Sequence, residues 1–225
     1  MDQKVIREQT IRDLKTNLIL DAARRVFSEM GFFDARLEDI ATAAGFSKAA
    51  LYTYYVDKEE IFMTLAIRDL ENLYHQLEAK VKPDMSFLKN LEELLTTIFT
   101  FFGENFALLL SVSNFQTMCK IHKEKLSEKH KLLFAELPSK FQKIIEQQIA
   151  LIKVARERKE IQSDIDDAQL ADYLYALVRG IIFHWQLRGK MGDVKLEIHQ
   201  LLKFMAYGLG CPANAGDPII SSVQS

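Results

Sequence analysis

The segment from Leu37 to Tyr55, LEDIATAAGFSKAALYTYY, constrains the fold of this 225-residue chain more than any other stretch. Its first half has apolar residues at positions 37, 40, 41 and 44, a spacing that predicts a short amphipathic helix over Leu37–Ala44. Gly45 then turns the chain, and Ser47 offers a hydroxyl N-cap to a second helix that we expect to run to about Tyr54. Two short helices joined by a glycine-containing turn predict a helix-turn-helix.

The side chains of this motif divide into an inward set and an outward set. Ala41 and Ala44 are small enough to let the two helices approach closely, and the inward apolar residues that can fill the shared core are Ile40, Phe46 and Leu51. Four residues of the second helix are left to face outward: Lys48, Ala49, Ala50 and Tyr52. A recognition helix presents its N-terminal residues to base edges in the major groove, so short side chains beside a lysine and a tyrosine indicate DNA binding.

Helical periodicity continues on both sides of the motif. It predicts a helix from Leu14 to Met30 stopped by Gly31, and another that is capped by Asp57 and ends before Pro83. Further helices are predicted at 86–102, 104–112, 115–122, 124–159 with a bend near Pro138, 166–188 and 194–209. We therefore expect an all-α fold of about nine helices, with a helix-turn-helix domain at 1–57, a helical domain at 58–209 and a flexible tail at 210–225.

Overall charge does not identify a nucleic-acid partner. The formal net charge is −2, and residues 1–58 hold nine Lys and Arg side chains against nine Asp and Glu. A strongly basic patch, the usual electrostatic sign of DNA binding, is therefore missing from the sequence. Contact with DNA must depend on where a few cations point.

Composition and motifs weigh against an enzyme and against a membrane protein. We find no glycine-rich phosphate loop, no G-x-S-x-G and no H-E-x-x-H motif, so no catalytic residue and no cofactor is predicted. Cys119 and His122 could ligate a metal or provide a redox thiol, but two ligands alone make a weak site, and we predict no metal. Two cysteines, a polar N-terminus and no apolar run of about 20 residues predict a soluble, cytoplasmic protein. An interaction protein that does not bind DNA remains the other alternative.

Ordered anchors across residues 19–62 resemble the TetR family of repressors. They are the A-A-x-x-x-F-x-x-x-G pattern ending at Gly31, the I-A-x-x-A-G pattern ending at Gly45, and S-K-x-x-L-Y-x-Y-Y-x-x-K-E from Ser47 to Glu59. Several anchors at the right spacings are more specific than a generic helix-turn-helix pattern. The resemblance implies a DNA-binding regulator with an N-terminal helix-turn-helix and a helical C-terminal domain.

The resemblance also implies which residues meet DNA. Its base or groove contacts fall on Lys48, Ala49, Ala50 and Tyr52 beside the cap Ser47, and its phosphate contacts fall on Thr53, Tyr54 and Lys58. Arg36 stands where the family usually has a threonine or serine cap, which suggests that this position binds a phosphate instead of capping the helix. Two alanines replace the usual Gly-Thr after the lysine, so apolar contact with thymine methyl groups is one way they could read sequence. Tyr55 is expected to be core.

By the same resemblance, the C-terminal domain would form a homodimer and bind an effector. The last two helices are apolar on more than one face, which suggests a four-helix interface that includes Leu174, Leu177, Ile181, Leu201, Leu202 and Met205. An aromatic-rich supply suggests a pocket for a largely apolar small molecule, with candidate lining residues Phe102, Phe106, Phe115, Gln116, Met118, Phe141, Tyr173 and His184. The implied function is a repressor that such an effector releases from a pseudo-palindromic operator, through the helix at 58–81 that both domains share.

Overall fold

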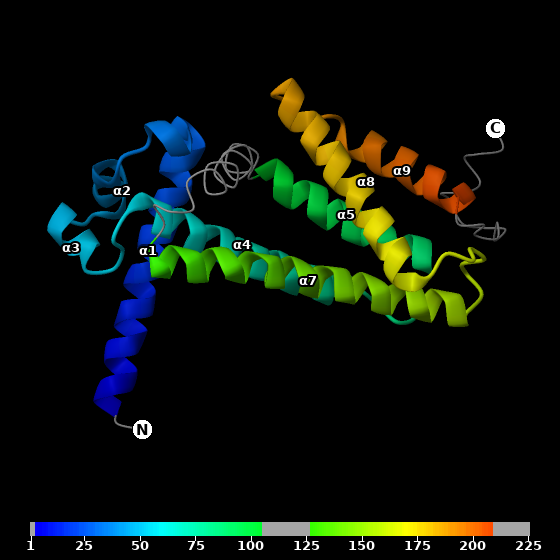
Figure 1. Ribbon diagram of the computed structural model, residues 1–225, viewed down its shortest axis with the longest axis horizontal. Coiled ribbons are helices and arrows are strands. Elements are labelled where there is room, and N and C mark those ends of the chain that lie inside the picture. The colour runs from blue at the N-terminus through cyan, green and yellow to red at the C-terminus, as the bar shows by residue number, and fades with distance from the viewer. Residues whose placement is uncertain (1–2, 105–126, 209–225) are drawn as a thin grey trace. The chain divides into compact units, whose positions relative to one another are not determined.

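The computed structural model of the chain describes residues 3–104 and 127–208, and their regular structure is entirely α-helical (Figure 1). The helices are α1 (Gln3–Asp34), α2 (Leu37–Ala44), α3 (Lys48–Tyr52), α4 (Lys58–Lys80), α5 (Phe87–Glu104), α7 (Glu128–Glu157), α8 (Asp167–Arg188) and α9 (Val194–Gly208). The predicted all-α fold class is confirmed. No helix within these described ranges has both the length and the apolar character needed to cross a membrane.

Several predicted element boundaries agree with the structure. The helix Leu37–Ala44 is found at its predicted limits, and α8 and α9 lie where helices were expected. Other boundaries differ: α1 begins about three turns earlier than predicted, and α3 ends at Tyr52. The long helix α7 runs through Pro138 as predicted, over Glu128–Glu157 instead of 124–159. The helices predicted at 104–112 and 115–122 and the tail at 210–225 lie outside the described residues, apart from the first residue of the former.

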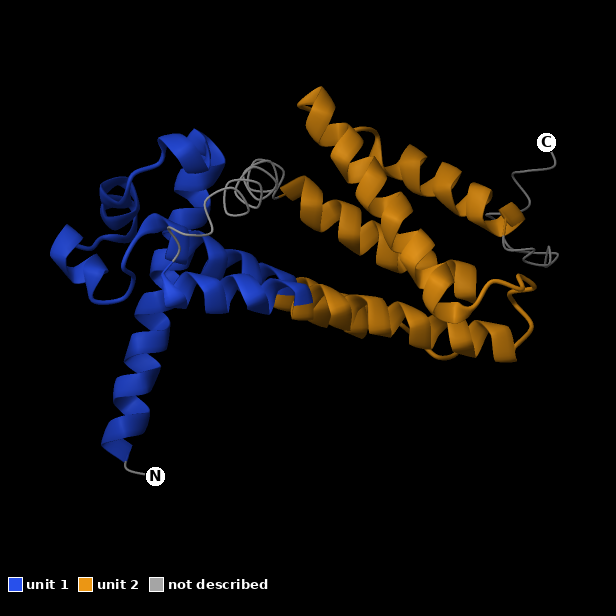
Figure 2. Ribbon diagram, in the orientation of Figure 1, with its two compact units in different colours: residues 1–70, 105–138 blue, residues 71–104, 139–225 orange. Residues whose placement is uncertain are grey.

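The chain divides into two compact units (Figure 2), which we describe separately. The first comprises residues 1–70 and 105–138, and the second comprises residues 71–104 and 139–225. Both α4 and α7 have residues in each unit. The sequence-based domain limits at 57 and 209 remain a prediction.

The first unit is built on a core of aromatic and aliphatic side chains from α1 to α4. Phe27, Phe32 and Phe62 are fully buried, and the ring centroids of Phe27 and Phe62 lie 5.3 Å apart in an edge-to-face arrangement. Ile40 and Leu51 reach the same core from the two short helices. These contacts fix α2 and α3 on one support, so the site is carried by packed elements rather than by loops.

The second unit is organised around α5. Phe87, Leu91, Leu95 and other apolar residues of α5 are buried, α8 and α9 pack against this helix, and the rings of Phe99 and Trp185 lie 5.1 Å apart. Asp166 caps α8 as predicted, because its carboxylate accepts hydrogen bonds from the backbone N–H groups of Ala168 and Gln169.

Candidate nucleic-acid interface

The turn between α2 and α3 is stabilised by backbone hydrogen bonds and one side-chain cap. Gly45 adopts a left-handed conformation with φ of 74°, and its N–H donates to the carbonyl of Thr42. The Ser47 hydroxyl accepts a hydrogen bond from the backbone N–H of Ala50 at 3.1 Å, which confirms the predicted N-cap. The turn therefore holds the start of α3 in one orientation relative to α2.

Arg36 precedes α2 and leaves its side chain exposed. An arginine side chain has no acceptor and cannot cap a helix. Asp39 instead accepts a hydrogen bond from the backbone N–H of Arg36 at 2.9 Å, which ties the start of α2 from the other direction. The helix start is thus stabilised without the hydroxyl cap, and the Arg36 guanidinium is available for another contact.

The structure brings most of the predicted base-contact residues to one exposed surface of α3. Lys48, Ala49 and Tyr52 are exposed, Ala50 is half-buried, and Leu51 points into the core with no exposed area. Thr53 follows the helix, and its hydroxyl donates to the carbonyl of Ala50 at 2.7 Å. This hydrogen bond helps explain why α3 ends earlier than the sequence predicts.

Glu38 joins this surface, although the sequence pattern did not single it out. Its carboxylate accepts a hydrogen bond from the Lys48 ammonium, and the Lys48 nitrogen also lies 5.9 Å from the centre of the Tyr52 ring. The pair remains accessible, with side-chain exposures of 52% for Lys48 and 50% for Glu38. The hydrogen bond with Glu38 raises the pKa of Lys48 and lowers the pKa of Glu38, so both groups are charged at neutral pH.

The two tyrosines after α3 have different surroundings. Tyr54 is half-buried, packs edge-to-face on Phe46 with centroids 5.9 Å apart, and has the Arg12 guanidinium 5.5 Å from its ring centre. Tyr55 is only 4% exposed, which confirms that it belongs to the core. Burial raises its pKa, and its hydroxyl has no hydrogen-bond partner among the described residues.

Lys58 lies at the start of α4 but points toward the end of α1. Its ammonium donates to the carbonyl oxygens of Phe32, Phe33 and Ala35 at 2.9, 3.0 and 2.9 Å. It also lies 4.8 Å from the centre of the Phe32 ring. Since an ammonium group has three N–H donors, a phosphate contact by Lys58 would have to replace one of these bonds.

The start of α4 is also held by the first turn of α7. Asp57 caps α4 through the backbone N–H of Glu60 at 2.8 Å, and the Nε2 atom of His130 lies 3.0 Å from the same carboxylate. Glu60 is buried, pairs with Lys129, and accepts a hydrogen bond from the backbone N–H of Val56. The segment between α3 and α4 is therefore restrained by residues of both α4 and α7.

The predicted effector and dimer residues occupy varied positions in the second unit. Phe102 and Phe141 are half-buried and Tyr173 and His184 are exposed, whereas Phe106, Phe115, Gln116 and Met118 lie outside the described residues. Among the predicted interface residues, only Leu177 is exposed and Ile181 is half-buried. The others are buried within the protomer: Leu174, Leu201, Leu202 and Met205.

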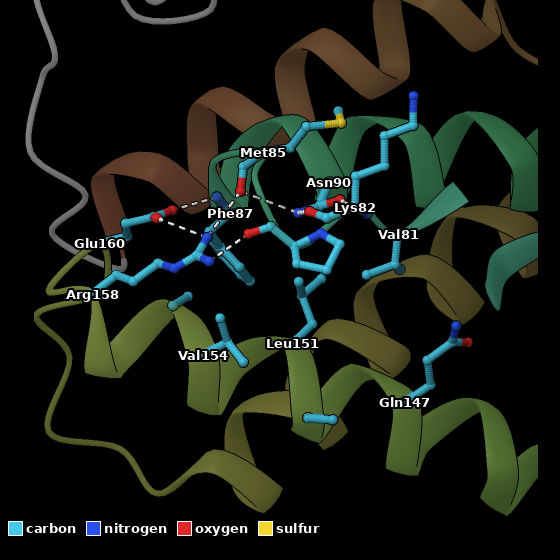
Figure 3. A pocket seen from close by; sticks show the side chains of 13 residues that line it. Val81, Lys82, Met85, Phe87, Asn90, Gln147, Leu151, Val154, Arg158 and Glu160 are labelled. Carbon is cyan, nitrogen blue, oxygen red and sulfur yellow. Dashed lines mark hydrogen bonds and ion pairs between the residues drawn. The ribbon is translucent and has the colours of Figure 1, made fainter. Parts of the chain in front are cut away.

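A cavity of about 200 Å³ lies in the second unit, between the segment joining α4 to α5 and the last turns of α7 (Figure 3). None of the predicted effector residues lines it. Its polar groups hold the segment: Asn90 bonds to both backbone groups of Lys82, and Arg158 donates to the carbonyls of Pro83 and Met85. The cavity is also smaller than the roughly 300–1,000 Å³ typical of ligand sites.

Comparison with known proteins gives the same assignment for the first unit. Residues 19–65 match the family model described as "Bacterial regulatory proteins, tetR family". The HTH-type transcriptional repressor NicS of Pseudomonas putida is 33% identical over 102 residues, which cover 43% of this chain and 46% of NicS, so the chain spans about half of that relative's length. The HTH-type transcriptional repressor BepR of Brucella suis is 26% identical over 87% of this chain and 92% of its own.

Similarity of fold extends to the second unit. The transcriptional regulator FadR from Bacillus subtilis, solved in complex with stearoyl-CoA, superposes with a TM-score of 0.66. The aligned residues are 16% identical and cover 85% of this chain and 97% of FadR. At this level of identity the likeness concerns the fold alone.

Proposed function

Because this chain belongs to the TetR family of helix-turn-helix transcriptional regulators, we propose that it is a repressor that a small, largely apolar effector releases from a pseudo-palindromic operator. Members of this family regulate transcription and are not enzymes. The observation that carries the proposal is the exposed surface of α3, held on a buried core by the Gly45 turn and the Ser47 cap. A rigid, exposed helix start is what major-groove binding requires.

In this proposal, the DNA contacts divide by chemistry. Lys48, Ala49, Ala50 and Tyr52 approach base edges, with Ser47 fixing the start of the helix. Arg36, Thr53 and Tyr54 are the proposed phosphate contacts beside them. Lys58 would join this set only by exchanging a carbonyl of α1 for a phosphate oxygen.

The proposed homodimer is supported by apolar side chains left exposed on α8 and α9. Leu177 is one of the predicted interface residues and is 37% exposed; the further residues of this kind are Tyr173, Phe183, Leu187, Leu196, Phe204 and Tyr207. Exposed apolar residues on two helices are typical of protein–protein interfaces. We therefore extend the proposed interface from the predicted residues to this exposed set, because a partner subunit can cover only side chains that the protomer leaves exposed.

The proposed effector class rests on chemistry and on one fold relative. FadR from Bacillus subtilis was solved with stearoyl-CoA, and a long acyl chain is the type of apolar ligand that an aromatic-rich helical domain can hold. Acyl-CoA esters are therefore the first effectors to test. Phe102 and Phe141 are described residues that could contribute to such a pocket.

Quantitative binding to DNA fragments selected from genomic sequence tests the proposal. Replacing Lys48 and Tyr52 together with alanine should weaken binding to the best fragment at least tenfold, because each lost base contact is worth about 1–3 kcal/mol. Lys143→Ala, which removes an exposed lysine of α7 in the second unit, should leave affinity unchanged. An effector should lower operator affinity about 5–150-fold. A double variant that binds as tightly as the unchanged protein would refute the DNA-binding role of α3.

A second measurement tests the dimer. Phe204→Arg and Tyr207→Glu, each at an exposed position of α9, should convert the dimer to a monomer in light scattering without loss of helical content. If both variants remain dimeric, the interface lies elsewhere.

A further inference from the structure

The ion pair between Glu38 and Lys48 lies on the surface that is proposed to meet DNA. Glu38 is in the first turn of α2 and Lys48 is the first residue of α3, so the pair connects the two helices of the motif. Tyr52, also exposed, lies one turn further along α3 beside the lysine. A carboxylate at this position requires an explanation, because DNA presents a dense array of negative phosphates.

DNA can meet this pair with a phosphate or with a base edge, and the two differ in the hydrogen-bond donors and acceptors that they present. A phosphate has only acceptor oxygens, which satisfy Lys48 but repel Glu38. The major-groove edge of a G·C base pair has acceptors on guanine O6 and N7 and a donor on the cytosine N4 amino group. Lysine pairs with guanine and a carboxylate accepts from cytosine, so a G·C edge can satisfy both members at once.

We propose, on the premise that the chain binds DNA through α3, that the Glu38–Lys48 ion pair selects a G·C base pair in each half-site and suppresses binding to phosphate. On non-specific DNA, Glu38 competes with phosphates for Lys48 and keeps the lysine neutralised. At the correct base pair, the Lys48 ammonium donates to guanine O6 or N7, and the Glu38 carboxylate accepts from the cytosine N4 amino group. Because exposed ion pairs contribute little to stability, this exchange is inexpensive for the protein.

The variant Glu38→Gln tests the inference, since it keeps the size of the side chain and removes its charge. It frees one lysine per protomer for a phosphate contact, and each such contact steepens the dependence of log affinity on log salt by about 0.9. For a dimer on non-specific duplex, the ratio of Kd at 200 mM salt to Kd at 50 mM should rise by about tenfold. At a single salt concentration, the preference for the selected fragment over a scrambled one should fall by about fivefold or more, because weakening one base contact costs about 1–3 kcal/mol of discrimination.

Matched variants assign this effect to the pair. Glu29→Gln makes the same charge change at an exposed position of α1, so it reports the effect of net charge alone. Glu38→Gln combined with Lys48→Gln should return the salt dependence on non-specific duplex to the unchanged value or below. All variants are checked by circular dichroism, and their binding is measured by fluorescence anisotropy on both duplexes.

The outcomes separate this inference from the proposed function. If the unchanged protein does not discriminate between any sequences, the proposed function fails. If it discriminates but Glu38→Gln behaves like Glu29→Gln, or its effect persists when Lys48 is also replaced, the ion pair is not the selective element. Selection of half-sites from a random library should enrich a G·C pair. This enrichment should weaken in Glu38→Gln and be lost when Lys48 is also replaced, and a selection without such a pair would overturn the inference.

Discussion

Replacing Lys58 with methionine should destabilise the first unit markedly, although the side chain lies near the protein surface. Methionine keeps an unbranched side chain of similar length but removes all three donors to the end of α1. Two of the three hydrogen bonds, to the carbonyls of Phe32 and Ala35, are partly buried, whereas the bond to Phe33 is exposed and water can replace it. The α1–α2 junction therefore loses its main polar partner.

The size of the effect follows from these contacts. A hydrogen bond to a charged group contributes about 1.5–3 kcal/mol, and these two are only partly buried, so their loss should cost about 2–4 kcal/mol together. Loss of the ammonium from the face of the Phe32 ring, 4.8 Å away, adds about 0.5–1 kcal/mol. We expect the free energy of unfolding to fall by about 3 kcal/mol, which corresponds to about 6–12 °C in Tm for a chain of this length.

Urea unfolding of the DNA-free protein, followed by circular dichroism, measures this loss. Lys15→Met, the same change at an exposed position of α1, should stay within about 0.5 kcal/mol of the unchanged protein. Trp185, the only tryptophan, lies in α8, so its fluorescence shows whether the second unit unfolds in the same transition. If Lys58→Met unfolds like the control but loses part of the salt dependence of DNA binding, Lys58 is a phosphate contact and does not hold the end of α1.

Three other changes test the caps and the buried acid of the fold. Gly45→Ala should lower the free energy of unfolding in urea by about 1–2 kcal/mol. This cost comes from the left-handed φ of 74° alone, because an added Cβ would meet no atom within 4 Å; an unchanged midpoint would mean that the turn relaxes freely. Asp166→Ala should lower stability by about 1 kcal/mol by removing two cap bonds from α8, visible as a lower Tm. Burial raises the pKa of Asp69 despite its bond to Arg24. The folded protein therefore keeps the proton on Asp69 to a higher pH than the unfolded chain does. The stability contributed by Asp69 declines as pH rises from the ordinary pKa of aspartate through the raised pKa. Asp69→Asn should abolish that decline, and an identical pH profile in the variant would contradict the assignment.

Local features of the fold were predictable from sequence because they depend on residues close together in the chain. Ser47, Asp57 and Asp166 each cap the helix that was predicted to follow them, since a side-chain acceptor reaches N–H groups only two or three residues away. The positive φ of Gly45 and the burial of Leu51 likewise follow from pattern and turn chemistry. These features were enough to identify the motif.

Contacts between helices could not be predicted in the same way. The Glu38–Lys48 pair and the bonds from Lys58 to α1 depend on how separate elements are packed, which periodicity does not encode. For α9, the sequence shows apolar residues on several faces but not which face turns inward. The structure buries Leu202 and exposes Phe204, so the face available to a partner differs from the one expected.

The two parts of α1 differ in how much free energy local unfolding should cost. Every residue from 3 to 15 is exposed, and the buried core begins at Ile19, where the family match also begins. A helical segment of this length with no buried residue is marginal in water. Opening of the first turns should therefore cost little more than the helix–coil free energy, whereas opening beyond Ile19 requires disruption of the core. Backbone amide hydrogens at the N-terminal end of α1 should therefore exchange readily with solvent, whereas those beyond Ile19 should be among the most protected from exchange in the unit.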